Sequence, residues 1–252
     1  MAKRPAFTVI NGVVVARDVE FEWFPGFSAA QKRRSIEAMH REIPGATLEV
    51  STKSKEQLGV KLSAFTLKLG GKSLESIFQG SKVFKQGGPY IDMYDKSPRD
   101  AKHDLRLKTS GELEAFEYNG VRWELLPRTA FYDYIYVKAV KECLTRDELQ
   151  KVAEYQFFTD IEFNPQKSIN TQARAIAIVK CLMETYDEIP EFNQSAWLAW
   201  HARHVRGWSN VVTLKETEML LQQLGLFTSI FIFLLVRFFR FHPYMVLKPQ
   251  EH

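Results

Sequence analysis

Cysteine is scarce in this chain, and the short motifs of several common enzyme classes are missing. The two cysteines, Cys143 and Cys181, lie far apart and belong to no paired metal-binding motif, so we expect buried free thiols in a reducing compartment. The sequence has no GxxxxGK[ST] phosphate loop, no GxGxxG, no HExxH and no GxSxG. These absences argue against a P-loop protein, a Rossmann enzyme, a zincin and an α/β-hydrolase.

Histidines are also few, and their spacing indicates no ligand set. The six are spread along the chain, and only His201 and His204 form an i, i+3 pair. A zinc site needs three or four ligands that converge on the metal. We therefore expect neither a metal nor a cofactor.

Neither sign of charge dominates the composition. The chain carries 34 basic and 30 acidic residues, which gives a net charge of +4. This mild excess permits contact with a phosphate-bearing substrate but does not by itself indicate one. The first residues, Met1–Pro5, lead into no apolar run, so we expect no signal peptide and a cytoplasmic protein.

The N-terminal part combines strand and helix signals. Residues 7–24 hold two apolar runs around Asn11-Gly12, a pair typical of hairpin turns. Ser28 can cap a helix that runs to about Glu42, with Gln31 completing a capping-box pattern. The basic side chains of this helix favour a solvated face, and a surface that follows a nucleic-acid backbone is the alternative.

Further along the chain, helix signals outnumber strand signals. Short strands are expected at 48–50 and 62–67, and a hairpin at 112–123 with Asn119-Gly120 at its tip. The apolar periodicity predicts helices from about Leu74, at 128–143, from 146 and at 170–186. The pattern predicts strands and a helix in the N-terminal part and several helices after it, which is an α+β fold.

The last part of the chain, residues 189–252, has an unusually hydrophobic composition. The run 224–236 carries no charge, but it is shorter than the about 20 apolar residues of a membrane-spanning helix. A buried helix, a membrane-surface helix and a foreign or frameshifted end are three alternatives. No clear membrane partner is indicated. We expect three parts, which are an extension at 1–50, a core domain at 51–188 and the tail at 189–252.

A stripe of polar residues is the most informative local feature. On a helix, Glu75, Gln79 and Lys82 project from one side at i, i+4 and i+7, next to the apolar Ile77 and Phe78. A buried carboxylate acts as a general acid or base, and a lysine in an apolar pocket can attack a carbonyl carbon. An ordinary charged helix face is the structural alternative.

Asp160 and Asn170 are the next candidates. Asp160 stands among aromatic residues, where it either takes part in chemistry or accepts hydrogen bonds from nearby backbone N–H groups. Asn170 opens the predicted helix 170–186, either as its N-cap or as a ligand of a ribose or a base. Tyr90 and Trp123 are either stacking platforms for a base or plain core aromatics.

With these residues in view, the chain resembles the NADAR family. Leu62-Ser63-Ala64-Phe65 is similar to the family's L-S-N-F element, with Ala64 in place of Asn. Residues 74–82 are similar to its V-E-H-x-F-Q-A-x-K helix, with Ser76 in place of His. Asp160 stands where the family has an acid in a D-x-x-W-G segment, although Trp-Gly is missing here.

The remaining motifs extend this resemblance and indicate one branch of the family. Trp123 resembles the tryptophan before the family's next helix, and Asn170 opens an element similar to N-x-x-G-x-x-L-M. The closer resemblance is to NADAR proteins that accompany DarT-type toxins as antitoxins. It spans about residues 5–185 and rests on segments that include Phe21-Glu22-Trp23 and Gly87-Gly88-Pro89-Tyr90.

The resemblance implies an α+β fold that is mainly α, in which an N-terminal β-hairpin region is added to a NADAR-like catalytic domain at 51–188. This domain would remove ADP-ribose from guanine bases in DNA. Its substrate would be ADP-ribosylated DNA or an ADP-ribose-bearing guanine nucleotide, and its partner a cognate DarT-type toxin. The residues implied to be catalytic are Glu75, Lys82 and Asp160, and those implied to bind substrate are Ser63, Phe65, Gln79, Tyr90, Trp123 and Asn170.

Two alternative functions remain. The first is an N-glycosidase for a small ribosylated metabolite, and the second is a non-catalytic module that neutralises a partner by contact. A basic track leading to the pocket would favour DNA over a metabolite. Its candidate residues are Arg33, Arg34, Lys82, Lys85, Arg99 and Lys102.

Overall fold

A long β-hairpin begins the chain in the computed structural model, which describes residues 1–26 and 28–206. Strand β1 (Ala2–Ile10) pairs antiparallel with β2 (Val13–Phe21) along its whole length. Asn11 and Gly12 both have positive φ, at 50° and 71°, as the predicted two-residue turn requires. The expected N-terminal hairpin is therefore confirmed.

This hairpin belongs to a four-stranded sheet, and its other two strands come from later segments of the chain. The strand order is β2-β1-β9-β3, where β3 spans Thr47–Glu49 and β9 spans Phe157–Thr159. Strands β3 and β9 are parallel, and β9 lies between β1 and β3. Because Asp160 directly follows β9, the sheet fixes the backbone position of this candidate residue.

Helix α1 (Ala29–Arg41) packs on the hairpin. Its apolar side chains Ile36 and Met39 are buried with Val19 and Phe21 of β2 in a small core cluster. Ser28 caps the helix as predicted, since its Oγ accepts a hydrogen bond from the Gln31 N–H. The Ser28 hydroxyl in turn donates a hydrogen bond to Gln31 Oε1 at 2.8 Å.

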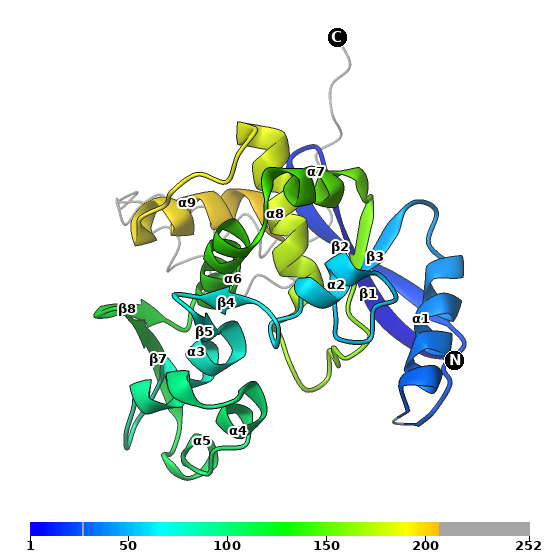
Figure 1. The fold of residues 1–252 in the computed structure, drawn as a ribbon. Helices are drawn as coiled ribbons and strands as arrows, with labels where there is room; N and C mark the ends of the chain where they lie inside the picture. The colour runs from blue at the N-terminus through cyan, green and yellow to red at the C-terminus, as the bar shows by residue number, and fades with distance from the viewer. Residues whose placement is uncertain (27, 207–252) are drawn as a thin grey trace, which may run out of the picture. The chain divides into compact units, whose positions relative to one another are not determined.

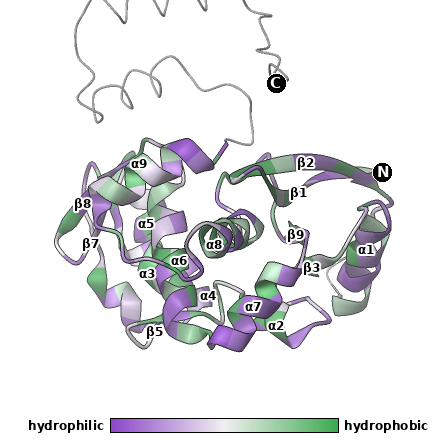
Figure 2. Ribbon diagram, turned by 90° about the horizontal axis from the view of Figure 1, so that it is seen from above, coloured by the Kyte–Doolittle hydropathy of each residue, from purple (hydrophilic) through white to green (hydrophobic). Residues whose placement is uncertain are grey.

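Helix α8 (Gln172–Tyr186) lies between the sheet and α6 (Ala130–Cys143), as the two views in Figures 1 and 2 show. Ala175, Ile176, Ala177, Ile178 and Val179 are all fully buried, so nearly every face of α8 is covered. Helix α7 (Arg146–Glu154) packs on α8 and begins with a Thr145–Glu148 capping box.

A second group of elements lies on the far side of α6 from α8. It contains β4 (Lys68–Leu69), β5 (Lys72–Ser73), α3 (Leu74–Gly80), β6 (Lys82–Phe84), the 3₁₀ helix η1 (Ile91–Asp95), α4 (Pro98–Lys102), α5 (Arg106–Thr109), β7 (Leu113–Tyr118) and β8 (Val121–Glu124). Strands β6, β7 and β8 form an antiparallel sheet. Phe78 of α3, Phe116 of β7 and Phe131 of α6 stack on one another and join the group to α6.

Two local expectations are wrong. Residues 62–67 form no strand, because they follow the short helix α2 (Gln57–Lys61) as a turn in which the Ser63 carbonyl accepts from the N–H groups of Thr66 and Leu67. Lys82 is not helical, because α3 ends at Gly80 and Lys82 pairs with Phe116 as the first residue of β6. Sheet pairing with β7 overrides continuation of the helix.

Helix α9 (Gln194–His204) packs on the core, although residues from 189 on were expected in the tail. Trp197 is fully buried, and its indole N–H donates to the Ala130 carbonyl at 2.8 Å. His201 Nε2 lies 2.9 Å from Asp133 Oδ2, and the Arg174 guanidinium makes two bonds to the same carboxylate. Residues 189–206 therefore belong to the packed structure, and the apolar run 224–236 lies outside the described residues.

No helix among the described residues is long and apolar enough to cross a membrane.

Candidate active site

Glu75, Gln79 and Lys82 meet in the structure as a connected row, which we call the Glu75–Lys82 row. Gln79 Nε2 donates to Glu75 Oε1 at 2.9 Å, and Lys82 Nζ donates to Gln79 Oε1 at 2.6 Å. Glu75 and Gln79 are buried, with 7% and 6% of their surface exposed. The amide thus joins the acid to the amine, and the ordinary solvated helix face is excluded.

The Lys82 ammonium lies in apolar surroundings. It stands 5.2 Å from the centre of the Phe78 ring, and its hydrogen-bond acceptor is a neutral amide. Burial lowers the pKa of Lys82, the Glu75 charge acts in the opposite direction, and the Lys102 charge lowers it further. A lysine with a lowered pKa is more often neutral and is therefore a better nucleophile.

Asp160 is the second buried acid, directly after β9. Its Oδ1 accepts from the Glu162 N–H at 3.1 Å, and its Oδ2 accepts from Thr171 Oγ1 at 3.3 Å and from Gln172 Nε2 at 3.2 Å. Burial raises the pKa of Asp160 to about 6, against the effect of these hydrogen bonds. A carboxyl group with this pKa carries a proton in a useful fraction of molecules near neutral pH.

Gln172 connects Asp160 to the Glu75–Lys82 row. Its Nε2 donates to Asp160, and its Oε1 accepts from the Ala64 N–H at 2.5 Å. The Ala64 carbonyl in turn accepts from the Glu75 N–H at 3.1 Å. The turn that contains Ser63 and Phe65 therefore lies between the two acids. Sequence reasoning missed Gln172, whose signal was a polar amide at the start of an otherwise apolar helix.

Tyrosines of α6 form a wall near both acids. Tyr132 is buried, and its ring meets that of Phe78 edge-on at 5.1 Å. Burial raises the pKa of Tyr132 well above its ordinary value, and the charges of Glu75 and Asp160 both add to this effect. Tyr136 donates its hydroxyl to the Leu62 carbonyl at 2.5 Å. The charges of both acids thus act on Tyr132, and that of Asp160 acts on Tyr136 as well.

Glu49 is a further buried acid that the sequence did not single out. Its Oε1 accepts from the Ile161 N–H at 2.9 Å, and its Oε2 accepts from Thr159 Oγ1 at 2.7 Å. His40 Nε2 lies 2.9 Å from the same Thr159 oxygen. Burial and the Asp160 charge raise the pKa of Glu49 to about 7, and burial lowers the pKa of His40 to about 4. Glu49 holds the backbone on the C-terminal side of Asp160.

The other candidate residues near the acids differ in exposure. The buried Ser63 hydroxyl accepts from the Phe65 N–H at 3.3 Å, whereas 40% of Phe65 is exposed. Asn170 is not the N-cap of α8, because that position belongs to Thr171. Asn170 Oδ1 is buried and has no hydrogen-bond partner among the residues that the structure describes. An acceptor left unpaired in a buried place is suited to receive a donor from a ligand.

Tyr90 and Trp123 form no hydrogen bond with the Glu75–Lys82 row in the described part of the chain, although the Tyr90 N–H donates to the Gly80 carbonyl of α3. Trp123 is 3% exposed and packs on Phe131 and Tyr134, so its ring is not open to a base. Tyr90 is half-buried, with the Arg106 guanidinium 4.5 Å from its ring centre and its hydroxyl bonded to Ser110. Both rings have a packing role.

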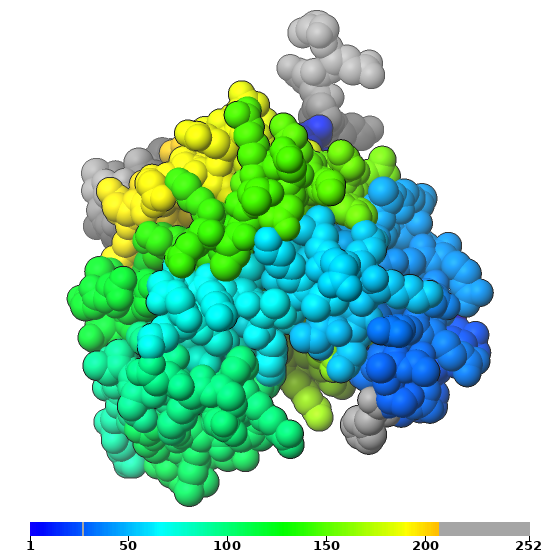
Figure 3. All heavy atoms as spheres, in the orientation of Figure 1, coloured from blue at the N-terminus to red at the C-terminus, as the bar shows by residue number. Residues whose placement is uncertain are grey.

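The six basic residues expected to form a track do not all gather at the acids. Arg33 and Arg34 lie on α1, whereas Arg99 and Lys102 lie on α4, at opposite sides of Figure 1. Figure 3 shows a recess between the segment around residue 100 and the N-terminal part, with atoms of the 160–170 segment inside it. Lys85 is exposed after β6, and its backbone N–H bonds Glu112.

No group of three or more His, Cys, Asp or Glu side chains in residues 1–26 and 28–206 is arranged to hold a metal ion. The candidate site consists of the acid Glu75, the amide Gln79 and the amine Lys82, connected through Ala64 and Gln172 to the second acid, Asp160. This set of groups is suited to acid-assisted cleavage of a glycosidic bond or to attack by an amine.

A comparison of the chain with models of known protein families found a match. The chain matches the model of the DarT1-associated NADAR antitoxin family over residues 2–202, and it belongs to this family. A search of the curated proteins found no match. The expected resemblance to NADAR antitoxins is confirmed, and the matched range includes most of α9. Membership indicates an antitoxin role in a DarT system, and NADAR proteins are generally associated with N-glycosidase activity.

Proposed function

We propose that this chain is a hydrolase that removes ADP-ribose from guanine bases in DNA and so reverses the action of a DarT-type toxin. The observation that carries this proposal is the link from the Glu75–Lys82 row through Ala64 and Gln172 to Asp160. It joins the Asp160 side chain to the backbone of Glu75, and the charges of both acids act on Tyr132, within a family of DarT1-associated antitoxins.

The bond to be broken joins ribose C1 to the exocyclic amine of guanine. Asp160 in its protonated form donates a proton to the departing nitrogen, and the Glu75 carboxylate stabilises the positive charge that develops on the sugar. Water then adds its hydroxyl to C1 and returns a proton to Asp160. The products are free ADP-ribose and unmodified guanine.

Lys82 offers a second route that uses the same groups. When the ribose ring opens, the ring oxygen takes the proton of the exocyclic nitrogen and a C=N bond forms between C1 and guanine. Neutral Lys82 Nζ then adds to C1, and guanine leaves as its free amine with the proton from Asp160. A protonated C=N bond to the lysine remains, and its extra proton returns to Asp160 on hydrolysis. Water hydrolyses that bond, which releases ADP-ribose and restores the amine. The lowered pKa of Lys82 favours this role, and in the first route the lysine acts through its charge.

Four of the remaining candidates, Gln79, Asn170, Ser63 and Phe65, position or bind the substrate in this proposal. Gln79 orients both Glu75 and Lys82, and Asn170 Oδ1 accepts a hydrogen bond from a ribose hydroxyl or a base. The Ser63 turn positions the exposed Phe65 ring beside the acids.

The test is release of ADP-ribose from a guanine-modified oligonucleotide, followed by mass detection, for the wild type and for Lys82→Ala, Glu75→Ala and Asp160→Ala. We expect many turnovers from the wild type and a loss of about 100-fold or more in each variant. Wild-type rates in all three variants would contradict the site. Release limited to one equivalent would indicate a binding module, and release from a free nucleotide alone would indicate a metabolite enzyme.

A further inference from the structure

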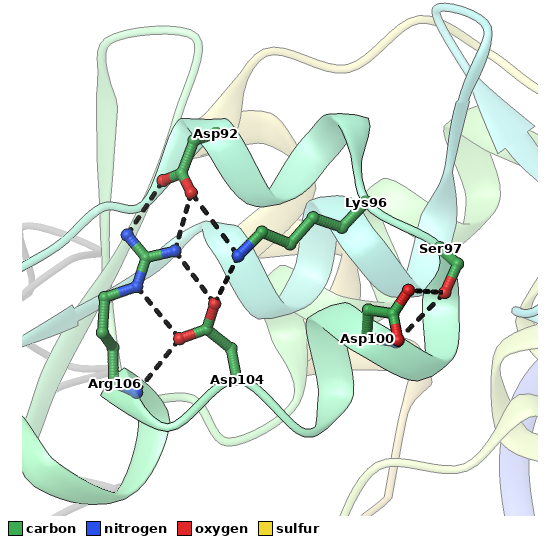
Figure 4. Close-up of polar contacts among 6 residues, drawn as sticks. All are labelled: Asp92, Lys96, Ser97, Asp100, Asp104 and Arg106. Atoms are coloured by element: carbon green, nitrogen blue, oxygen red, sulfur yellow. Dashed lines mark hydrogen bonds and ion pairs between the residues drawn. The ribbon is translucent and has the colours of Figure 1, made fainter.

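In the segment from η1 to α5, some charged side chains form ion pairs and others do not. Arg106 pairs with both Asp92 and Asp104, and Lys96 pairs with the same two carboxylates, as Figure 4 shows. The pKa of Asp104 is held low, above all by the Arg106 hydrogen bond. These four side chains neutralise one another and fix η1 against the start of α5.

Lys102 and Arg99, in contrast, are left without a counter-charge. Both are exposed on α4, three residues apart, and neither forms an ion pair among residues 1–26 and 28–206. The remaining acid of α4, Asp100, accepts from Ser97 at the helix N-terminus. Among the lysines and arginines of this segment, Arg99 and Lys102 on α4 and Lys108 on α5 therefore form no ion pair within the described part of the chain.

The Lys102 ammonium lies close to Phe65, a residue of the candidate active site. It lies 5.3 Å from the centre of the Phe65 ring, and Phe65 belongs to the turn between the two acids. Its charge reaches Lys82, whose pKa it lowers. The Lys102 ammonium thus lies beside the exposed Phe65 ring, and its charge acts on the Lys82 ammonium of another element. An anion bound next to Lys102 would relieve their repulsion.

We propose that Lys102, next to the exposed ring of Phe65, forms a phosphate-binding subsite at the entrance to the Glu75–Lys82 row. The recess in Figure 3 has the segment around residue 100 on one side and the 160–170 segment within it, so a bound phosphate there would adjoin the cleaved bond. The phosphate comes either from the DNA backbone beside the modified guanine or from the pyrophosphate of the ADP-ribosyl group. The identity of this ligand rests on the proposed function.

The experiment compares the wild type, Lys102→Ala and Lys102→Arg on two substrates. One is an oligonucleotide with a single ADP-ribosylated guanine, and the other is ADP-ribosylated guanosine, which has no DNA phosphate. Lys108→Ala is the matched control, because Lys108 is an exposed lysine on the neighbouring helix α5 and forms no ion pair in the described part of the chain.

We expect Lys102→Ala to raise KM about five- to tenfold with kcat within twofold, since a phosphate contact contributes about 1 kcal/mol to binding. Lys102→Arg restores KM, and Lys108→Ala leaves it unchanged. A rise with the oligonucleotide alone assigns the subsite to DNA phosphate, and an equal rise with both substrates assigns it to the pyrophosphate. An unchanged KM in Lys102→Ala, or the same rise in Lys108→Ala, overturns the proposal.

A binding measurement separates this proposal from the proposed function. Anisotropy of a fluorescent unmodified oligonucleotide and calorimetry with free ADP-ribose are recorded for the same variants at several salt concentrations. We expect Lys102→Ala to weaken one of these two ligands and to reduce its salt dependence by about one unit of slope. If the wild type releases no ADP-ribose yet this loss is seen, the reaction is wrong and the subsite stands; with no loss for either ligand, the subsite is wrong.

Discussion

Asp133 and Asp160 are both buried carboxylates that contact residues of α8, yet their surroundings give them opposite properties. Asp133 is fully buried and bonded to Arg174, His201 and Thr129. Burial alone would raise the pKa of Asp133, but the charge of Arg174 and the bond from His201 outweigh it and lower the pKa. Asp160 receives only neutral donors, and burial raises its pKa to about 6.

The difference shows what a cation beside a buried acid does. Asp133 of α6 stays ionised and ties three helices together, because it pairs with Arg174 of α8 and His201 of α9. Arg174 also donates to the Ile169 carbonyl before α8. Asp160 forms no ion pair in the described part of the chain and can exchange a proton near neutral pH. The first carboxylate therefore holds the structure, and we assign the second to the chemistry.

The largest expected effect is on the reaction. Asp160→Asn removes the proton donor but keeps a side chain of the same size, so we expect kcat to fall by about 10²–10⁴-fold. Release of ADP-ribose under saturating substrate measures this loss. The far-ultraviolet circular dichroism should match the wild type, and a kcat within threefold of the wild type would remove Asp160 from the mechanism.

The same substitution at the paired acid should affect folding. Asp133→Asn leaves the Arg174 charge buried without its counter-charge, which costs about 3–5 kcal/mol of unfolding free energy. Urea unfolding of the two Asn variants side by side measures the contrast. Equal stability of Asp133→Asn and Asp160→Asn would show that the Arg174 pair is not what distinguishes the two acids.

Glu49 should make stability depend on pH. Its pKa is about 7 when folded and 4.5 when free, so the folded protein binds a proton more tightly between these values. Stability from this group is therefore full below about pH 4.5 and is lost as pH rises through 7, by about 3 kcal/mol. Glu49→Gln has no charge to bury, and we expect its unfolding free energy to fall less between pH 5 and pH 8. A decline as steep as that of the wild type would refute this account of Glu49.

Gln172 should tune Asp160 rather than react. Its hydrogen bond lowers the pKa of Asp160, so Gln172→Ala should raise that pKa and let the acid keep its proton at higher pH. We expect the alkaline limb of the kcat profile to move to higher pH, and the free energy of unfolding to fall by about 1 kcal/mol. The groups that face Asp160 and stay in place are Glu49, Thr171, Tyr132 and Tyr136. An alkaline limb that stays in place would mean that the bond to Gln172 does not set this pKa.

Local features of the fold could be predicted from the sequence. The Asn11-Gly12 and Asn119-Gly120 turns adopt positive φ as expected, and Ser28 caps α1 through its own hydroxyl. Each depends on residues only a few positions apart, so short patterns suffice.

Contacts between distant segments could not be predicted in this way. The parallel pairing of β3 with β9 and the hydrogen bond from the Ala64 N–H to Gln172 Oε1 join residues more than 100 positions apart. The strand position of Lys82 follows from pairing with β7, and no helical periodicity indicates such pairing. The packing of α9 depends on the contact between His201 and the buried Asp133 of α6, and the composition of residues 189–206 does not reveal this contact.

The pH dependence of kcat tests the central claim most directly. The measurement follows ADP-ribose release from the modified oligonucleotide between pH 4.5 and pH 9 for the wild type and Asp160→Asn. If Asp160 is the acid, wild-type kcat declines as pH rises past about 6, and the residual activity of Asp160→Asn lacks this limb. The same alkaline limb in both proteins would contradict the assignment of Asp160 as the unpaired acid that drives the reaction.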